Sequence, residues 1–160
     1  MSIAAFGKVS GLQYLERMKD RGDFLPLEEI PLPRRATAGS AGYDFTATFT
    51  VTLGPGESET IPTGIRVKMD PGWVLLLFPR SSLGYRYELR LSNTVGVIDS
   101  DYWYADNEGH IMVRVHNGGS KPVTIVKGDR FCQGIFVPFG TADEEEVTAA
   151  RHGGFGSTDR

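Results

Sequence analysis

The sequence predicts an all-β domain, built as a sandwich or as a closed barrel. From about residue 34 onward, short segments rich in Val, Ile, Thr and Phe alternate with turns made of glycine and proline. The chain of 160 residues contains 20 glycines and 9 prolines, a content that favours many short strands over long helices. This length fits one domain, which can bury a core without disulfides or metal ions.

The first 33 residues predict a short helix followed by an extended arm. The helix is expected over residues 9–20, before Gly22, because apolar residues recur there at helical spacing. Its apolar face is expected to contain Val9, Leu12, Leu15 and Met18. Three prolines between residues 26 and 33 predict the extended arm, since proline lacks the N–H that a helix interior needs.

The strands are expected in segments bounded mostly by glycine- or proline-containing turns. These segments are 43–53, 65–69, 73–78, 111–116, 122–126 and 131–137. The run 73–78 is apolar throughout, which is typical of a strand buried on both faces. Residues 34–140 therefore form the β-domain, and residues 141–160 form a glycine-rich arm with too few apolar side chains to pack by itself.

Composition excludes several classes of function. The formal net charge of −3 gives no long-range attraction for nucleic acid or a membrane, so neither is expected as a partner. Cys132 is the only cysteine, so no intrachain disulfide can form and a cytoplasmic location is expected. The three histidines are scattered and give no zinc spacing. The first ten residues do not resemble a signal peptide, and no apolar run could span a bilayer.

The stretch Gly96–Tyr102 carries the strongest indication of chemistry. Apolar residues are followed at once by Asp99, Ser100, Asp101 and Tyr102. A carboxylate held on a strand beside an apolar wall is where a general base is expected, because partial burial makes a carboxylate more basic. The alternative is a strand that simply runs out into a polar turn.

Two other segments are suited to binding phosphate. Pro79–Gly84 places an arginine and two serine hydroxyls directly after the apolar strand, where backbone amides become free. Arg151–Thr158 combines glycines with an arginine and Phe155, as in a flap that closes over a flat ring. The alternatives are an ordinary polar turn for the first segment and a disordered tail for the second.

Five segments in order resemble the motifs of the trimeric dUTPase family. They are 41–45 (Ala-Gly-Tyr-Asp-Phe), 79–84, 93–102, 128–138 and 151–158. The resemblance runs from about Arg34 to the end of the chain. It implies a jelly-roll-like β-barrel that forms a homotrimer, in which each active site draws on all three chains. It also implies hydrolysis of dUTP to dUMP and pyrophosphate with Mg²⁺, which keeps uracil out of DNA and supplies dUMP for thymidylate synthesis.

The resemblance assigns the nucleoside contacts to the third motif and its surroundings. It makes Asp99 the catalytic base, which activates a water for attack on the α-phosphorus. Tyr102 lies against the deoxyribose and leaves no room for a 2′-hydroxyl. Uracil is read by a hairpin whose polar groups mimic a pairing base; the residues implied are Asn93, Gly96, Val97 and Ile98, with Met112 also at the substrate.

The phosphate contacts implied by the resemblance come from the second, fourth and fifth motifs. Ser81 contacts the oxygen that bridges the α- and β-phosphates, supported by Arg80, Ser82 and Gln133. The flap residues Arg151, Phe155, Gly156, Ser157 and Thr158 close over the bound nucleotide, with Phe155 on the uracil face and Ser157 and Thr158 near the γ-phosphate. Mg²⁺ is held by the triphosphate and water with no direct protein ligand. Asp44 either organises the metal and phosphate region without contacting the metal directly, or holds a turn.

The chain departs from the family pattern at three places. Trp103 and an insertion, Tyr104–Glu108, follow the third motif. We expect Trp103 and Tyr104 to pack on a neighbouring subunit; the alternative is that they stay partly exposed. Cys132 stands for the usual alanine and is expected to be a small buried apolar residue. Asp159 stands for the usual glycine after Thr158.

Two other functions remain open. One is a dCTP deaminase, an enzyme with the same fold, although no glutamate occurs in the context that deamination needs. The other is a nucleotide-gated regulatory module that binds a protein, as phage-type members of the family do. Its candidate partner surfaces are the Tyr104–Glu108 insertion and the N-terminal helix.

Overall fold

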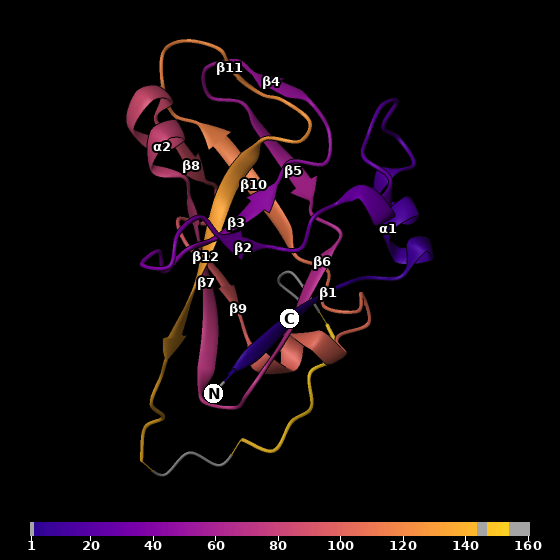
Figure 1. Cartoon of the computed structure of the whole chain (residues 1–160), viewed down its shortest axis with the longest axis vertical. Coiled ribbons are helices and arrows are strands. Elements are labelled where there is room, and N and C mark those ends of the chain that lie inside the picture. Colours follow the sequence, from indigo (N-terminus) through magenta and orange to yellow (C-terminus); the bar gives the residue numbers. More distant parts are fainter. Residues whose placement is uncertain (1, 144–146, 154–160) are drawn as a thin grey trace.

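A computed structural model of the chain describes residues 2–143 and 147–153 (Figure 1). Within these residues, twelve strands form four small antiparallel sheets, and only short helices accompany them. The all-β prediction is therefore confirmed. None of the helices in the described part is both long and apolar enough to cross a membrane.

The largest sheet has five strands in the order β2-β3-β12-β7-β9. Its strands are β2 (Arg34–Arg35), β3 (Tyr43–Thr46), β12 (Arg130–Pro138), β7 (Trp73–Pro79) and β9 (Gly96–Ile98). A second sheet has the order β5-β10-β8, with β5 (Ser58–Pro62), β10 (Met112–Asn117) and β8 (Leu89–Leu91). Two strand pairs complete the fold: β1 (Ala4–Lys8) with β6 (Ile65–Met69), and β4 (Val51–Leu53) with β11 (Val123–Ile125).

The core lies between these sheets. It contains large side chains from most strands, among them Phe45, Ile61, Leu75, Leu91 and Phe131. Cys132 is fully buried beside them, as predicted, and burial raises the pKa of its thiol. The prediction that β7 is buried on both faces is wrong for one chain. Its buried residues alternate with half-buried ones, because within one chain only one face of this strand lies against the core.

The predicted N-terminal helix is present as α1 (Gly11–Met18), but its buried face differs from the prediction. Leu12 and Leu15 are 82% and 56% exposed, whereas Tyr14 and Met18 are buried. Residues four apart lie one above the other on a helix, so Tyr14 and Met18 form one narrow contact. The Tyr14 hydroxyl also donates to the Leu25 carbonyl, which ties the helix to the arm that follows it.

Two short helices occupy stretches that were expected to be turns. The segment after β7 forms α2 (Ser81–Tyr87), which ends at Glu88 in the left-handed conformation. Residues Ser100–Tyr104 form a 3₁₀ helix, η2, directly after β9 and Asp99. A third, η1 (Leu27–Glu29), lies within the predicted extended arm. These helices decide where the candidate site residues lie, because Ser81 and Tyr102 begin or sit inside them.

Candidate active site

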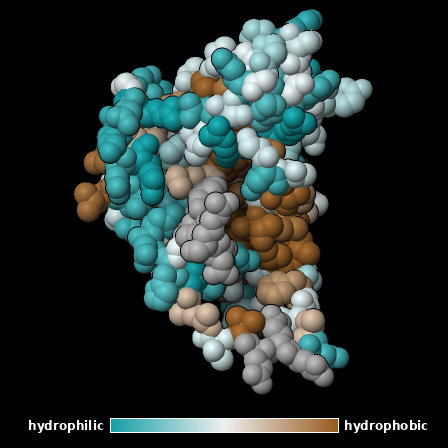
Figure 2. All heavy atoms as spheres, turned by 180° about the vertical axis from the view of Figure 1, so that it is seen from behind, coloured by the Kyte–Doolittle hydropathy of each residue, from teal (hydrophilic) through white to brown (hydrophobic). Residues whose placement is uncertain are grey.

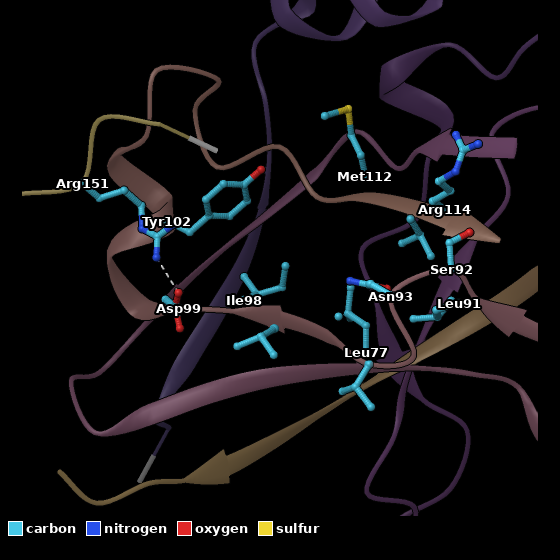
Figure 3. Close-up of a pocket in the computed structure, with 14 residues that line it drawn as sticks. Leu77, Leu91, Ser92, Asn93, Ile98, Asp99, Tyr102, Met112, Arg114 and Arg151 are labelled. Carbon is cyan, nitrogen blue, oxygen red and sulfur yellow. Dashed lines mark hydrogen bonds and ion pairs between the residues drawn. The ribbon is translucent and has the colours of Figure 1, made fainter. Parts of the chain in front are cut away.

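The residues predicted to read a nucleoside line one cavity of about 510 Å³, which we call the hairpin pocket (Figure 3). Its floor is the turn between β8 and β9, and its walls come from β7, β10 and η2. All the contacts predicted from the third motif and its surroundings lie in it: Asn93, Gly96, Val97, Ile98, Asp99, Tyr102 and Met112. The structure thus brings this half of the predicted site together.

The floor of the hairpin pocket is a tight turn. Backbone hydrogen bonds join Thr94 N to Leu91 O and Val95 N to Asn93 O. Thr94 has φ of +71°, a left-handed conformation that non-glycine residues rarely adopt. Gly96 lies so close to β7 that a Cβ on it would stand 3.0 Å from the Cβ of Leu77. This backbone is therefore held against β7, with its polar groups at the pocket.

Asp99 points into the pocket at the end of β9, with its side chain 47% exposed. Arg151 donates to its carboxylate (Figure 3). Arg151 also donates to Asp101 at 2.8 Å. The His152 carbonyl accepts from the amide of Asp106, so this part of the arm lies along the insertion. The arginine of the predicted flap therefore reaches the pocket on its own chain. The predicted flap residues Phe155, Gly156, Ser157 and Thr158 lie outside the described residues.

Tyr102 forms one side of the pocket and is only 6% exposed. Its hydroxyl donates to the His110 carbonyl at 2.9 Å and accepts from Asn107 Nδ2 at 2.8 Å. Burial raises the pKa of this phenol, so it is a neutral group with both hydrogen-bonding functions used. The ring is held in one orientation by contacts that the sequence did not reveal.

Four residues predicted to bind phosphate lie together with Asp44 and Arg130 in a second group, which we call the arginine cluster: Asp44, Arg80, Ser81, Ser82, Arg130 and Gln133. The carboxylate of Asp44 contacts Arg80 Nε at 3.3 Å through Oδ1 and Arg130 NH1 at 3.1 Å through Oδ2. Its side chain is only 10% exposed. Gln133 donates to the Pro79 carbonyl at the end of β7, immediately before Arg80. Asp44 thus presents two guanidinium groups beside the first residues of α2.

Asp99 and the arginine cluster lie at opposite ends of β7. Ile98 pairs with Leu75, so Asp99 stands level with Val74, while Ser81 lies beyond Pro79. At about 3.3 Å per residue, this places Asp99 and Ser81 about 20 Å apart along one chain. No single small phosphate group can contact both of them on the same chain.

An apolar row runs across the five-stranded sheet from Val97 of the hairpin pocket. Leu76 of β7 pairs with Val97 on one side and with Ile135 on the other, so the three side chains share a face. Val97 is 58% exposed and the other two are half-buried. Figure 2 shows that hydrophobic residues gather in a patch on the back of the molecule.

Several functional contacts were not found from the sequence. Arg130 pairs with Asp44, Asp101 pairs with Arg151, and Asn107 holds Tyr102. Trp103 is partly exposed in one chain, where the Arg66 guanidinium stacks on its ring at 3.5 Å and donates to its carbonyl at 2.6 Å, and its packing on a neighbour stays a prediction. Tyr104 is 69% exposed in one chain, so its packing on a neighbour stays a prediction. The one signal in the sequence for Arg130 was its position as a charged residue within the fourth motif.

Comparisons with known proteins agree with one another. The chain matches the dUTPase family model over residues 28–159. It is 43% identical over 154 residues to the deoxyuridine 5′-triphosphate nucleotidohydrolase of Lactococcus lactis, with 94% of this chain and 98% of the relative covered. It is 44% identical over 138 residues to the enzyme of that name from Hahella chejuensis, with 81% and 88% covered.

Solved structures give the same result for the fold. The dUTPase of Streptococcus mutans superimposes with a TM-score of 0.68 at 37% identity, covering 86% of this chain and 98% of that one. The dUTPase of phage phi11 of S. aureus gives a TM-score of 0.68 at 21% identity, covering 92% and 97%, which shows a shared fold alone. The Lactococcus alignment covers 94% of this chain, which is more than residues 34–160 contain. It therefore includes most of the residues before Arg34.

Proposed function

The chain belongs to the dUTPase family, whose fold is a jelly-roll-like β-barrel, and from this premise we propose that it hydrolyses dUTP to dUMP and pyrophosphate. The observation that carries the proposal is the hairpin pocket, a cavity of about 510 Å³ that is bordered by the Asp99 carboxylate and by the Tyr102 ring. The reaction keeps uracil out of DNA and supplies dUMP for thymidylate synthesis. A cytoplasmic location belongs to the same proposal, supported by a single thiol that is free and buried.

In this proposal the pocket recognises uracil by hydrogen bonds. Asn93 and the backbone of Gly96–Ile98 offer donors and acceptors that complement the edge of uracil. Cytosine presents a donor where uracil presents an acceptor, and the mismatch leaves buried groups unpaired at a cost of about 1–3 kcal/mol each. The close contact between Gly96 and Leu77 supports this reading, because it keeps the hairpin backbone from shifting to accept another base.

Asp99 serves as the general base. Its carboxylate orients a water, accepts a proton from it, and directs the oxygen at the α-phosphorus. A bond forms from this oxygen to phosphorus while the bond to the bridging oxygen breaks, and pyrophosphate leaves. Ser81 donates to the bridging oxygen, where negative charge develops, and thus stabilises the transition state more than the ground state. Before substrate binds, Arg151 neutralises Asp99, and phosphate oxygens then compete for this guanidinium.

Each active site is shared between copies of the chain in a homotrimer. The separation of about 20 Å between Asp99 and Ser81 on one chain supports this, since both must reach the same phosphate group. The partly exposed row Val97, Leu76 and Ile135 supplies an apolar surface that another copy can cover. A second chain would then bring its arginine cluster to the hairpin pocket of the first.

Mg²⁺ is part of the proposal as a companion of the triphosphate. Within the described ranges, no three His, Cys, Asp or Glu side chains gather as a metal site. Asp44 is the carboxylate of the arginine cluster, and both its oxygens already contact arginines. With its oxygens engaged in this way, Asp44 fits a metal that is held by phosphates and water and that contacts Asp44 only through a water molecule. When bound, Mg²⁺ supplies positive charge to the phosphate oxygens.

The test is pyrophosphate release from dUTP, UTP, dCTP and dTTP, with wild type and Asp99→Asn. We expect turnover of dUTP alone, and a fall in kcat of about 10²- to 10⁴-fold in the variant, because an amide cannot accept the proton. Asp101→Asn is the matched control, since Asp101 also pairs with Arg151 but belongs to the helix η2 and not to the end of β9. Its kcat should stay close to wild type. Equal hydrolysis of all four nucleotides, or ammonia release from dCTP, would contradict the proposal.

A further inference from the structure

We propose that Asn107 is a positioning residue for sugar discrimination: it fixes the Tyr102 ring, and the N-terminal segment holds the Asn107 loop in place. The inference rests on the proposed function, in which Tyr102 excludes a 2′-hydroxyl. An excluding ring must not be able to move aside, because a shift of less than the size of a hydroxyl would admit ribose. What prevents this shift is therefore part of the specificity.

The Tyr102 hydroxyl is the end of the ring that Asn107 controls. Asn107 Nδ2 donates to it at 2.8 Å, and the hydroxyl then donates to the His110 carbonyl at 2.9 Å. A hydroxyl has one proton, so donation from Asn107 directs that proton toward His110. The two bonds from opposite partners fix the far end of the ring, while the near end is fixed by the backbone of η2.

The orientation of Asn107 is in turn determined by its own loop. Its Oδ1 accepts from the amide of Gly109 at 3.1 Å, which leaves Nδ2 to face the phenol. Gly109 has φ of +70°, and a Cβ on it would stand 2.6 Å from the Tyr102 carbonyl oxygen. Only glycine lets the loop close so tightly over the residue that it supports. The insertion is thus built around Tyr102.

The N-terminal segment holds this loop from outside. The Glu108 carboxylate accepts from Ser10 N at 2.7 Å and from Ser10 Oγ at 2.6 Å, and these bonds lower the pKa of Glu108. His110 is fully buried, and its Nε2 accepts from the amide of Gly64 at 2.9 Å. Its Nδ1 must then carry the proton, which it donates to Gln13 Oε1 at 3.3 Å. The loop is therefore tied to residues around the start of α1 through Glu108 and His110, which follow Asn107 in the sequence.

The test compares how variants of the full chain bind UMP and dUMP, measured as the ratio of the two Kd values by titration calorimetry. In Asn107→Ala we expect the preference for dUMP to fall by about fivefold to tenfold, the effect of one lost hydrogen bond that restrained the ring. The kcat for dUTP should change by less than about twofold, because Asn107 does not touch the reacting atoms. An unchanged Kd ratio would overturn the inference.

Asn117→Ala is the matched control. Asn117 makes the same turn, with Oδ1 accepting from Gly119 N at 3.0 Å, but it contacts Leu53 and Lys121 rather than Tyr102. We expect this variant to lower the melting temperature and to keep the wild-type Kd ratio. A shift in the ratio as large as that of Asn107→Ala would mean that any loosening of the fold relaxes discrimination, and would contradict a specific role.

A double-mutant cycle with Tyr102→Phe makes the test independent of that control. Phenylalanine has no hydroxyl for Asn107 to hold, so Asn107→Ala should have no further effect on the Kd ratio in this background. Additive effects would overturn the inference. The proposed function is tested separately, by pyrophosphate release from dUTP with wild type, so its failure and the failure of this inference give different results.

Discussion

The hairpin pocket and the arginine cluster are built on different physical principles. The pocket is formed by residues close together in the sequence, between Leu91 and Arg114, with Leu77 and Arg151 added. Its lining is largely apolar, and the Tyr102 ring within it is fixed by buried hydrogen bonds. The arginine cluster joins residues from β3, α2 and β12, and its shape depends on ion pairs to one carboxylate.

This difference teaches which property each region can control. Rigid packing and buried hydrogen bonds discriminate between similar shapes, because a wrong ligand leaves polar groups unpaired. Charged groups bind phosphate strongly but cannot tell one nucleoside from another. We therefore expect changes in the arginine cluster to alter rate or phosphate affinity without altering selectivity, and changes around the hairpin pocket to alter selectivity or its structural support.

The largest effect that separates the two regions is expected from Ser81→Ala. Removing a donor from the oxygen that gains charge should lower kcat for dUTP by about 10²- to 10³-fold. The preference for dUTP over UTP and dCTP should remain, since the hairpin pocket is intact. Steady-state kinetics with the three nucleotides measure both quantities.

Ser82→Ala is the matched control, because Ser82 is the next residue of α2 and is equally exposed. We expect its kcat to fall only a few-fold. If Ser81→Ala also lost selectivity, the two regions could not be acting separately.

The hairpin pocket could be predicted from the sequence, whereas the connection between regions could not. Asn93 through Tyr102 are consecutive, so one turn and one strand bring them to the same cavity whatever the rest of the fold does. The pairing of Asp44 with Arg130 crosses 86 residues, and a contact of that range leaves no local pattern. The same holds for Ser10 and Glu108, which are 98 residues apart.

The prediction of local structure failed where tertiary contacts override the pattern of the sequence. The helix α2 contains Gly84 and two tyrosines, which weaken any helical signal. The strand β1 was not expected, because its sequence is short and has a glycine; it forms by pairing with β6 from Ala4 to Lys8. The separation of Asp99 from Ser81 follows from the register of β7 with β9, which the sequence does not show.

The second-largest effect is expected on the pH dependence of folding stability, through His110, which helps to hold the loop beside the hairpin pocket. Burial lowers the pKa of His110 from 6.5 to about 4, so the folded protein keeps this imidazole neutral. The unfolded chain binds a proton at higher pH than the folded one, so stability is complete above pH 6.5 and falls as the pH drops toward 4. The loss over this window is about 3 kcal/mol.

Chemical denaturation at several pH values measures this loss. His110→Gln should remove this component of the pH dependence, because glutamine can still accept from Gly64 N but does not titrate. His116→Gln, which replaces an imidazole bonded to Ser58 at 2.8 Å on the sheet surface, should keep it. A wild-type slope in His110→Gln would show that other groups cause the acid sensitivity.

The smallest effect is expected from Asp44→Asn in the arginine cluster. The amide keeps the size of the carboxylate but loses its charge, so Arg80 and Arg130 are no longer both held toward α2. An ion pair of this partly exposed kind contributes about 1 kcal/mol, which corresponds to a rise in KM for dUTP of about fivefold. Glu59→Gln is the control, because Glu59 pairs with Arg21 at 2.8 Å and belongs to neither region, and its KM should not change. The Kd ratio of UMP to dUMP should stay at the wild-type value in both variants. If Asp44→Asn changed that ratio, charge in the arginine cluster would also shape the hairpin pocket.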